Sequence, residues 1–453
     1  MKKNIFLVFF LTFSIFKVYS QISENKYIPD EIDSLKTYLK RINSNQIKSI
    51  EGSFSSKIKK VYKDRDEKVI ESINDSVYYF SHEISSNLSN ILNNIYKSNP
   101  NQINSKDYGF FIKNSIIPNA GCYGDGMFEV NLGLFTTLNC DDELAFVLCH
   151  EIAHFILEHS IKNVTNVVST INSKETKSKI KEIKKNEYGQ FRAALAVIDE
   201  LNIDILDYSK EVEAEADSIG YLMFAKTNYN KSSALTSLNK LKKIDDMILH
   251  HDVRLDSVFN FQNYPFKKYW LKEEVPIFDS EEEINEFKLT SDTVKTHPEI
   301  EFRVSKLIKD FNIQNETSSV SNTFLPAIQE ISHLQNIQYS LDMKLLDFAI
   351  YQLILNFNDN NITPDYYYSK MSQLLLKIYQ AKKNHKLGKY VPQKSNFSKE
   401  KNLNNIRLFI HNLELSEIKK IGLAFCEENK DNLKQTKEFT ESHEFFKSIN
   451  KYK

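Results

Sequence analysis

The sequence predicts a mainly α-helical protein that contains a small β-sheet, an α+β fold. Glycine and proline contribute only 10 and 9 of the 453 residues, which disfavours architectures built from many turns. Only residues 108–112 and 127–131 have the pattern of strands, and Gly124-Asp125-Gly126 supplies turn residues before the second one. Elsewhere apolar residues recur at helical spacing, as in Ile84, Leu88, Ile91, Leu92 and Ile95.

The charge balance excludes a class of partner. Lysine and arginine number 59 against 60 aspartates and glutamates, so the formal net charge is −1. Nucleic-acid binding depends on a surplus of basic residues, and this chain has none. We therefore expect no nucleic-acid partner.

The N-terminus has the order of residues found in export signals. Lys2 and Lys3 precede the apolar run 5–16, and cleavage is plausible after Ser20. A retained membrane anchor is the alternative, but this run makes a helix of only about 18 Å against about 30 Å of hydrocarbon. Residues 1–20 therefore predict an exported protein, periplasmic or secreted, that associates with a membrane only through an uncleaved N-terminus.

An exported protein can form disulfides, and four cysteines are available. Cys122 and Cys140 are the most plausible pair because they flank one predicted hairpin. Cys149 lies in an apolar helical segment and is expected in the core.

The rest of the chain divides by composition. Residues 21–105 form a polar N-terminal helical region, and a strong helix is predicted from about Asp141 to Ser160. Residues 161–190 are lysine-rich and resemble an insertion or a mobile arm. Residues 313–453 are again helical; a tetratricopeptide-like array is one reading, although no clean period of about 34 residues is present.

The segment that carries chemistry is His150-Glu151-x-x-His154 within the strong helix. Histidines at i and i+4 share one helix face, so both imidazoles can reach one metal ion. Glu151 lies about 100° around the helix, where it can touch a water on that metal without being a ligand. Zinc lowers the pKa of bound water to about 7, and Glu151 can act as its general base.

A third ligand is expected further along the chain. The metzincin pattern would need Gly at 157 and His at 160, but Leu157 and Ser160 occupy these positions. Residues 211–220 instead place Glu213 and Asp217 one helical turn apart. Glu213 can complete a site of two histidines and one glutamate, and Asp217 can accept the second N–H of a ligand histidine. A solvated acidic helix face is the alternative, which the small residues in the same segment disfavour. His159 is expected to continue the first helix as a partly exposed residue.

These motifs resemble the zinc metallopeptidases of the HtpX and CAAX-prenyl-protease group, peptidase family forty-eight. The family combines HExxH with a distant Glu-x-x-Ala-Asp, which residues 213–217 match with Glu213 in the ligand position. Asn119-Ala120 and Gly133-Leu134 are similar to the family's approach to the HExxH helix. Thr296-His297-Pro298 followed by Arg303 is similar to a later family element.

The resemblance implies a metallopeptidase domain at residues 106–312 with one Zn²⁺ per chain. It implies that His297 stabilises the oxyanion and that Arg303 braces the ligand carboxylates. It also implies polypeptide substrates, above all unfolded or misassembled envelope proteins. By the same likeness, a substrate would pair with an edge strand beside the HExxH helix, and we expect that strand to be Met127, Phe128, Glu129, Val130 and Asn131.

Two other classes of function stay open at this stage. A zinc-stapled helical scaffold could bind client proteins with proteolysis latent or lost, although an intact Glu151 argues against loss. A zinc hydrolase acting on a non-peptide amide, such as cell-wall material, is the weaker alternative.

Overall fold

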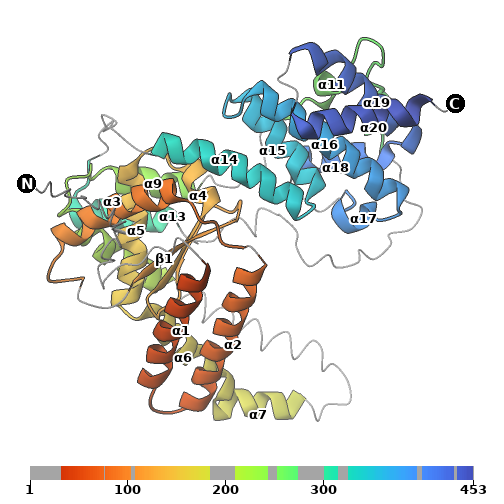
Figure 1. The fold of residues 1–453 in the computed structure, drawn as a ribbon. Helices are drawn as coiled ribbons and strands as arrows, with labels where there is room; N and C mark the ends of the chain where they lie inside the picture. Colours follow the sequence, from red (N-terminus) through yellow and green to blue (C-terminus); the bar gives the residue numbers. More distant parts are fainter. Residues whose placement is uncertain are drawn as a thin grey trace, which may run out of the picture.

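A computed structural model describes the chain in nine stretches: residues 32–75, 77–103, 108–183, 210–242, 252–273, 300–314, 325–394, 400–432 and 436–451. It confirms a mostly helical protein with one small sheet (Figure 1). The predicted signal at 1–20 and the predicted electrophile His297 lie outside the described residues.

The sheet has three strands in the order β1-β3-β2. Strand β1 (Gly109–Lys113) runs parallel to β3 (Met127–Asn131), and β2 (Ala120–Cys122) runs antiparallel to β3. Gly124 and Gly126, with φ of 82° and 97°, form the tight turn between β2 and β3, where the left-handed backbone favours glycine.

The prediction that residues 127–131 form an edge strand is wrong. Strand β3 is central, so β1 and β2 occupy its hydrogen-bonding groups on both sides. Residues 77–79 cover the outer side of β1, where Tyr79 N donates to Ile112 O over 2.8 Å. Among the described residues no strand pairs with the outer side of β2, which packs against α5.

One face of the sheet packs on a large hydrophobic core. Phe110 and Phe128 stack with ring centroids 4.6 Å apart, and Phe155 from α5 meets Phe128 edge-on. Around them gather α3 (His82–Ser98), α4 (Leu132–Thr137), α5 (Asp141–Ile156), helical residues 210–224, α9 (Ser233–Lys242) and α13 (Ile300–Phe311). Because α5 is buried almost along its whole length, it is the central helix of this core.

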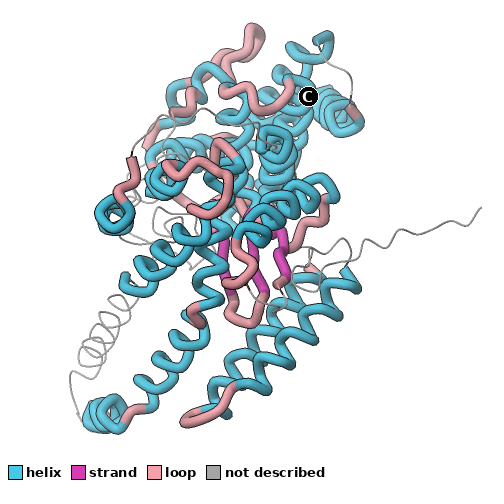
Figure 2. The backbone as a smooth tube through the Cα atoms, turned by 90° about the vertical axis from the view of Figure 1, so that its left-hand side faces the viewer, coloured by secondary structure: helices cyan, strands magenta, loops and turns pink. Residues whose placement is uncertain are grey.

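The opposite face of the sheet is covered by a helical hairpin. Helices α1 (Ile32–Ser49) and α2 (Ser55–Asn74) bury Tyr38 and Leu39 against Phe111 and Met127. Figure 2 shows the hairpin beside the three strands. The N-terminal half of α2 contacts α6 (His159–Asn172), and α7 (Lys174–Ile183) follows α6. The described part of the lysine-rich segment is therefore helical.

The C-terminal helices form a second core (Figure 1). Helix α14 (Leu325–Asp342) contacts both α4 and α15, so it joins the two cores. The second core comprises α15 (Leu346–Asn358), α16 (Pro364–Lys383), α17 (Leu387–Tyr390), α18 (Lys401–Asn412), α19 (Leu415–Asn429), the 3-10 turn η2 (Lys430–Asn432) and α20 (Lys437–Lys451).

Residues 252–273 belong to this second core, although the sequence places them within 106–312. They include the short α11 (Leu255–Val258) and the 3-10 turn η1 (Lys268–Leu271). The indole of Trp270 is fully buried and donates to Glu417 of α19 over 2.9 Å. The predicted boundary at residue 312 therefore does not follow the packing.

The expected disulfide between Cys122 and Cys140 is absent, because both residues are free thiols. Cys122 ends β2, and the chain then forms β3 and α4 before Cys140 begins α5. The two cysteines thus do not flank one hairpin, which was the basis of the expectation. Cys149 is buried in the core as expected.

No single described helix combines the length and apolar character of a membrane span; α5 together with residues 159–179 does, across a bend of 51°.

The close approach of helical residues 210–224 to α5 depends on one glycine. A Cβ atom at Gly220 would lie 2.9 Å from the Cα of His150, which is backbone and cannot move aside cheaply. We expect Gly220→Ala to destabilise the fold by about 1–3 kcal/mol, because overpacking forces the two helices apart. Gly388→Ala is the matched control, since its Cβ meets nothing within 4 Å. Equal melting temperatures for the two variants would contradict this account.

Candidate metal centre

Helix α5 presents two histidines on one face. His150 and His154 are one turn apart, and their Nε2 atoms lie 3.0 Å from each other. The acidic residues in the first turn of α5 complement the helix dipole and also bind neighbouring segments. Asp141 accepts a hydrogen bond of 3.1 Å from Leu325 N at the start of α14, and Asp142 accepts one of 3.0 Å from Asn230 N. These bonds fix the helix against neighbouring segments, so the imidazoles project from a rigid element.

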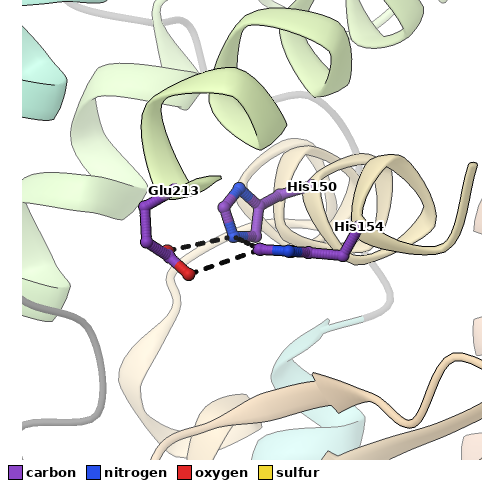
Figure 3. A group of neighbouring side chains, drawn as sticks. All are labelled: His150, His154 and Glu213. Carbon is purple, nitrogen blue, oxygen red and sulfur yellow. Dashed lines mark hydrogen bonds and ion pairs between the residues drawn. The ribbon is translucent and has the colours of Figure 1, made fainter. Parts of the chain in front are cut away.

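The second helix, residues 210–224, brings Glu213 to the same point (Figure 3). Its carboxylate oxygens lie 3.5 Å from His150 Nε2 and 3.4 Å from His154 Nε2. One ligand atom from each of the three residues lies within 4.8 Å of the others. The structure thus brings together the three residues that the sequence predicts as ligands.

The side chains of Asp217 and Arg303 support the three predicted ligands through hydrogen bonds and ion pairs. Asp217 Oδ1 is 2.9 Å from His150 Nδ1, the nitrogen that faces away from Glu213. Arg303 of α13 makes two bonds to the Asp217 carboxylate, of 2.6 and 2.7 Å, and its Nη1 lies 2.8 Å from Glu213 Oε2. Both side chains are 2% exposed, so these are buried ion pairs.

The buried charges determine the protonation of the group. Burial would raise the pKa of Asp217, but the adjacent Arg303 guanidinium outweighs it and lowers the pKa to about 2. Burial would lower the pKa of His150, but hydrogen bonds to Asp217 and Glu213 outweigh it and raise the pKa to about 10. The Asp217–Arg303 ion pair therefore stays charged at neutral pH, and the acidic partners of His150 favour the protonated form of its ring.

Glu151, the predicted base, lies beside the group without joining it. Its side chain is buried, and its charge acts on both the Cys122 thiol of β2 and the Arg303 guanidinium. With both ligand histidines neutral, as metal binding requires, Glu151, Glu213 and Asp217 contribute three formal negative charges against one positive charge on Arg303, a balance of −2. A divalent cation would neutralise this balance, and two imidazole nitrogens with one carboxylate are ligands that zinc accepts.

His159 does not continue α5 as a partly exposed residue, so that prediction is wrong. It is 4% exposed, starts α6 rather than continuing α5, and places its Nδ1 3.0 Å from His154 Nδ1. Helix α5 ends because Glu158 adopts a left-handed backbone with φ of 59°. No glycine or proline near this position predicts the end of the helix. A histidine five residues after His154 was the only available signal.

Comparison with known proteins agrees with this geometry. The model of peptidase family M48 matches residues 87–310, a range that contains both ligand helices and Arg303. The match over this range supports a zinc metallopeptidase of family M48. A search of curated proteins found no match.

Replacing Asp217 tests the support behind the histidines. In Asp217→Asn the amide NH2 group, a donor, replaces one carboxylate oxygen and must face an N–H donor of either His150 or Arg303. We therefore expect the free energy of unfolding to fall by about 3–5 kcal/mol and the zinc affinity to fall about 10–100-fold. Asp347→Asn is the matched control, because Asp347 forms a buried ion pair of 2.8 Å with Arg407 in the second core.

The control should lose stability but keep its zinc affinity. Thermal unfolding and competition with a chromophoric chelator measure the two quantities separately. Unchanged zinc binding by Asp217→Asn would contradict the proposed support.

Proposed function

We propose that the protein is an exported zinc endopeptidase in which His150, His154 and Glu213 bind one Zn²⁺. The observation that carries the proposal is the convergence of these three side chains beside a buried glutamate that is not a ligand. A purely structural zinc site is closed by protein ligands and has no use for such a base.

Zinc bound at this site would lower the pKa of a coordinated water and polarise the scissile carbonyl. Glu151 would take a proton from the attacking water and deliver it to the leaving amine nitrogen. Arg303 donates to Asp217 through Nε and Nη2, forms an ion pair with Glu213 through Nη1 and is 2% exposed, so it serves the ligands rather than the substrate. His297 remains our proposed oxyanion donor on the basis of the family resemblance.

We propose β2, in place of β3, as the strand that pairs with a substrate backbone. It is the open edge of the described sheet and it packs against α5. Backbone pairing would hold an extended polypeptide with little side-chain preference, which suits unfolded or misassembled substrates. In this antiparallel register Asn119, Gly121 and Tyr123 direct their backbone groups at β3, so Ala120 and Cys122 face outward. Ser160 Oγ already donates to Cys122 O over 2.8 Å, so pairing would use mainly Ala120.

The location and the role of the flanking regions are also proposals. Residues 1–20 favour export, and substrates would then be exported or envelope proteins, with protein quality control as the biological role. The helices of the second core would recruit such clients or gate access to the site.

Digestion of casein by the purified protein tests the activity. We expect cleavage that 1,10-phenanthroline abolishes and zinc restores, and a loss of about 10²–10⁴-fold in kcat/KM for Glu151→Gln with zinc still bound. Glu211→Gln is the matched control, an exposed carboxylate on the Glu213 helix, and should cleave normally. Cleavage that survives the chelator or Glu151→Gln would contradict the proposal. A protein that binds zinc without cleaving would instead favour the client-binding alternative.

A further inference from the structure

The junction between α5 and α6 turns a third histidine toward the metal centre. After Ile156 the chain passes through the left-handed Glu158 and restarts as a helix at His159. The His159 ring therefore points back at His154, with ring centroids 5.0 Å apart and planes at 73°. Its Nδ1 is 3.0 Å from the outer nitrogen of His154, a hydrogen-bonding distance.

The other nitrogen of His159 reaches the second ligand helix. His159 Nε2 lies 3.2 Å from Glu215 Oε2, and Glu215 is two residues beyond Glu213. The Glu215 side chain is 59% exposed, whereas the His159 side chain is 4% exposed. These contacts thus connect the partly buried ligand His154 to a carboxylate in solvent.

The positions of the protons give the hydrogen bonds from His154 through His159 to Glu215 a direction. His154 points Nε2 at Glu213 and His150, so a metal ligand at Nε2 must carry its proton on Nδ1. With that proton on His154 Nδ1, the His159 Nδ1 atom 3.0 Å away is the acceptor. The proton of His159 then lies on Nε2, where it faces the Glu215 carboxylate.

We propose that His159 is a positioning residue that, together with Glu215, orients His154 and selects the tautomer that binds the metal through Nε2. This inference rests on the proposed metal site. His150 receives the equivalent support directly from Asp217. The two contacts of His159 also connect the α5–α6 bend to the helix that carries Glu213.

The surroundings of His159 suit an acceptor. Its side chain is 4% exposed, so little water competes for the Nδ1 lone pair. Groups that support a metal-bound histidine through its second nitrogen are typically worth about 10–100-fold in metal affinity. A histidine that only fills space would contribute to stability and not to metal binding.

The test compares zinc affinity with folding stability in His159→Phe and His159→Gln. Phenylalanine keeps the ring but removes the acceptor, whereas the glutamine amide oxygen can still accept from His154. We expect His159→Phe to weaken zinc binding about 10–100-fold and to change the visible spectrum of the Co²⁺-substituted protein. His159→Gln should recover most of the affinity. His333→Phe, which removes a half-buried imidazole on α14, is the matched control and should bind zinc normally.

A second variant covers the case in which His159→Phe does not fold. Glu215→Ala removes an exposed side chain and should weaken zinc binding in the same direction by a smaller factor, while Glu211→Ala should not. Wild-type zinc affinity in His159→Phe, or equal losses in His159→Phe and His159→Gln, would overturn the inference. A wild-type protein that binds no zinc would instead show that the metal site itself is wrong, before any variant is compared.

Discussion

The guanidinium of Arg303 is the interaction on which the rest of the site depends. It is buried, and a buried cation without partners costs several kcal/mol. Its partners are Asp217, through two hydrogen bonds, and the ligand carboxylate of Glu213. Asp217 in turn holds His150. One side chain from α13 thus holds the helix that carries Glu213 and Asp217, and it supports His150 of α5 through Asp217. Removing any member of the group leaves a buried charge or a mobile ligand.

Packing brings these helices to the required separation. Gly220 lets residues 210–224 approach the backbone of His150 closely, so that Glu213 can reach both imidazoles. Helix α14 is bonded to the first turn of α5 and joins the second core to the first. The metal centre therefore rests on elements that extend through both cores, which explains why residues far from His150 in sequence position it.

The residues of the centre could be predicted from the sequence because helical periodicity is local. The spacing of His150 and His154, and of Glu213 and Asp217, places each pair on one helix face before any tertiary structure is known. Strand β2 could not be predicted, because Ala-Gly-Cys is too short to show alternation, and its absence made β3 look like an edge. The end of α5 at Ile156 depends on the left-handed Glu158, and the packing of Trp270 on Glu417 depends on tertiary contacts. Neither leaves a local signal.

X-ray absorption spectroscopy of the zinc-loaded protein tests the central claim most directly, since it reports the ligands themselves. The account predicts one zinc per chain with nitrogen and oxygen ligands at about 2.0–2.2 Å and outer-shell scattering from two imidazoles. The spectrum of Glu213→Gln should differ in the nearest shell. Scattering from sulfur at about 2.3 Å, or from fewer than two imidazoles, would contradict a centre built from His150, His154 and Glu213.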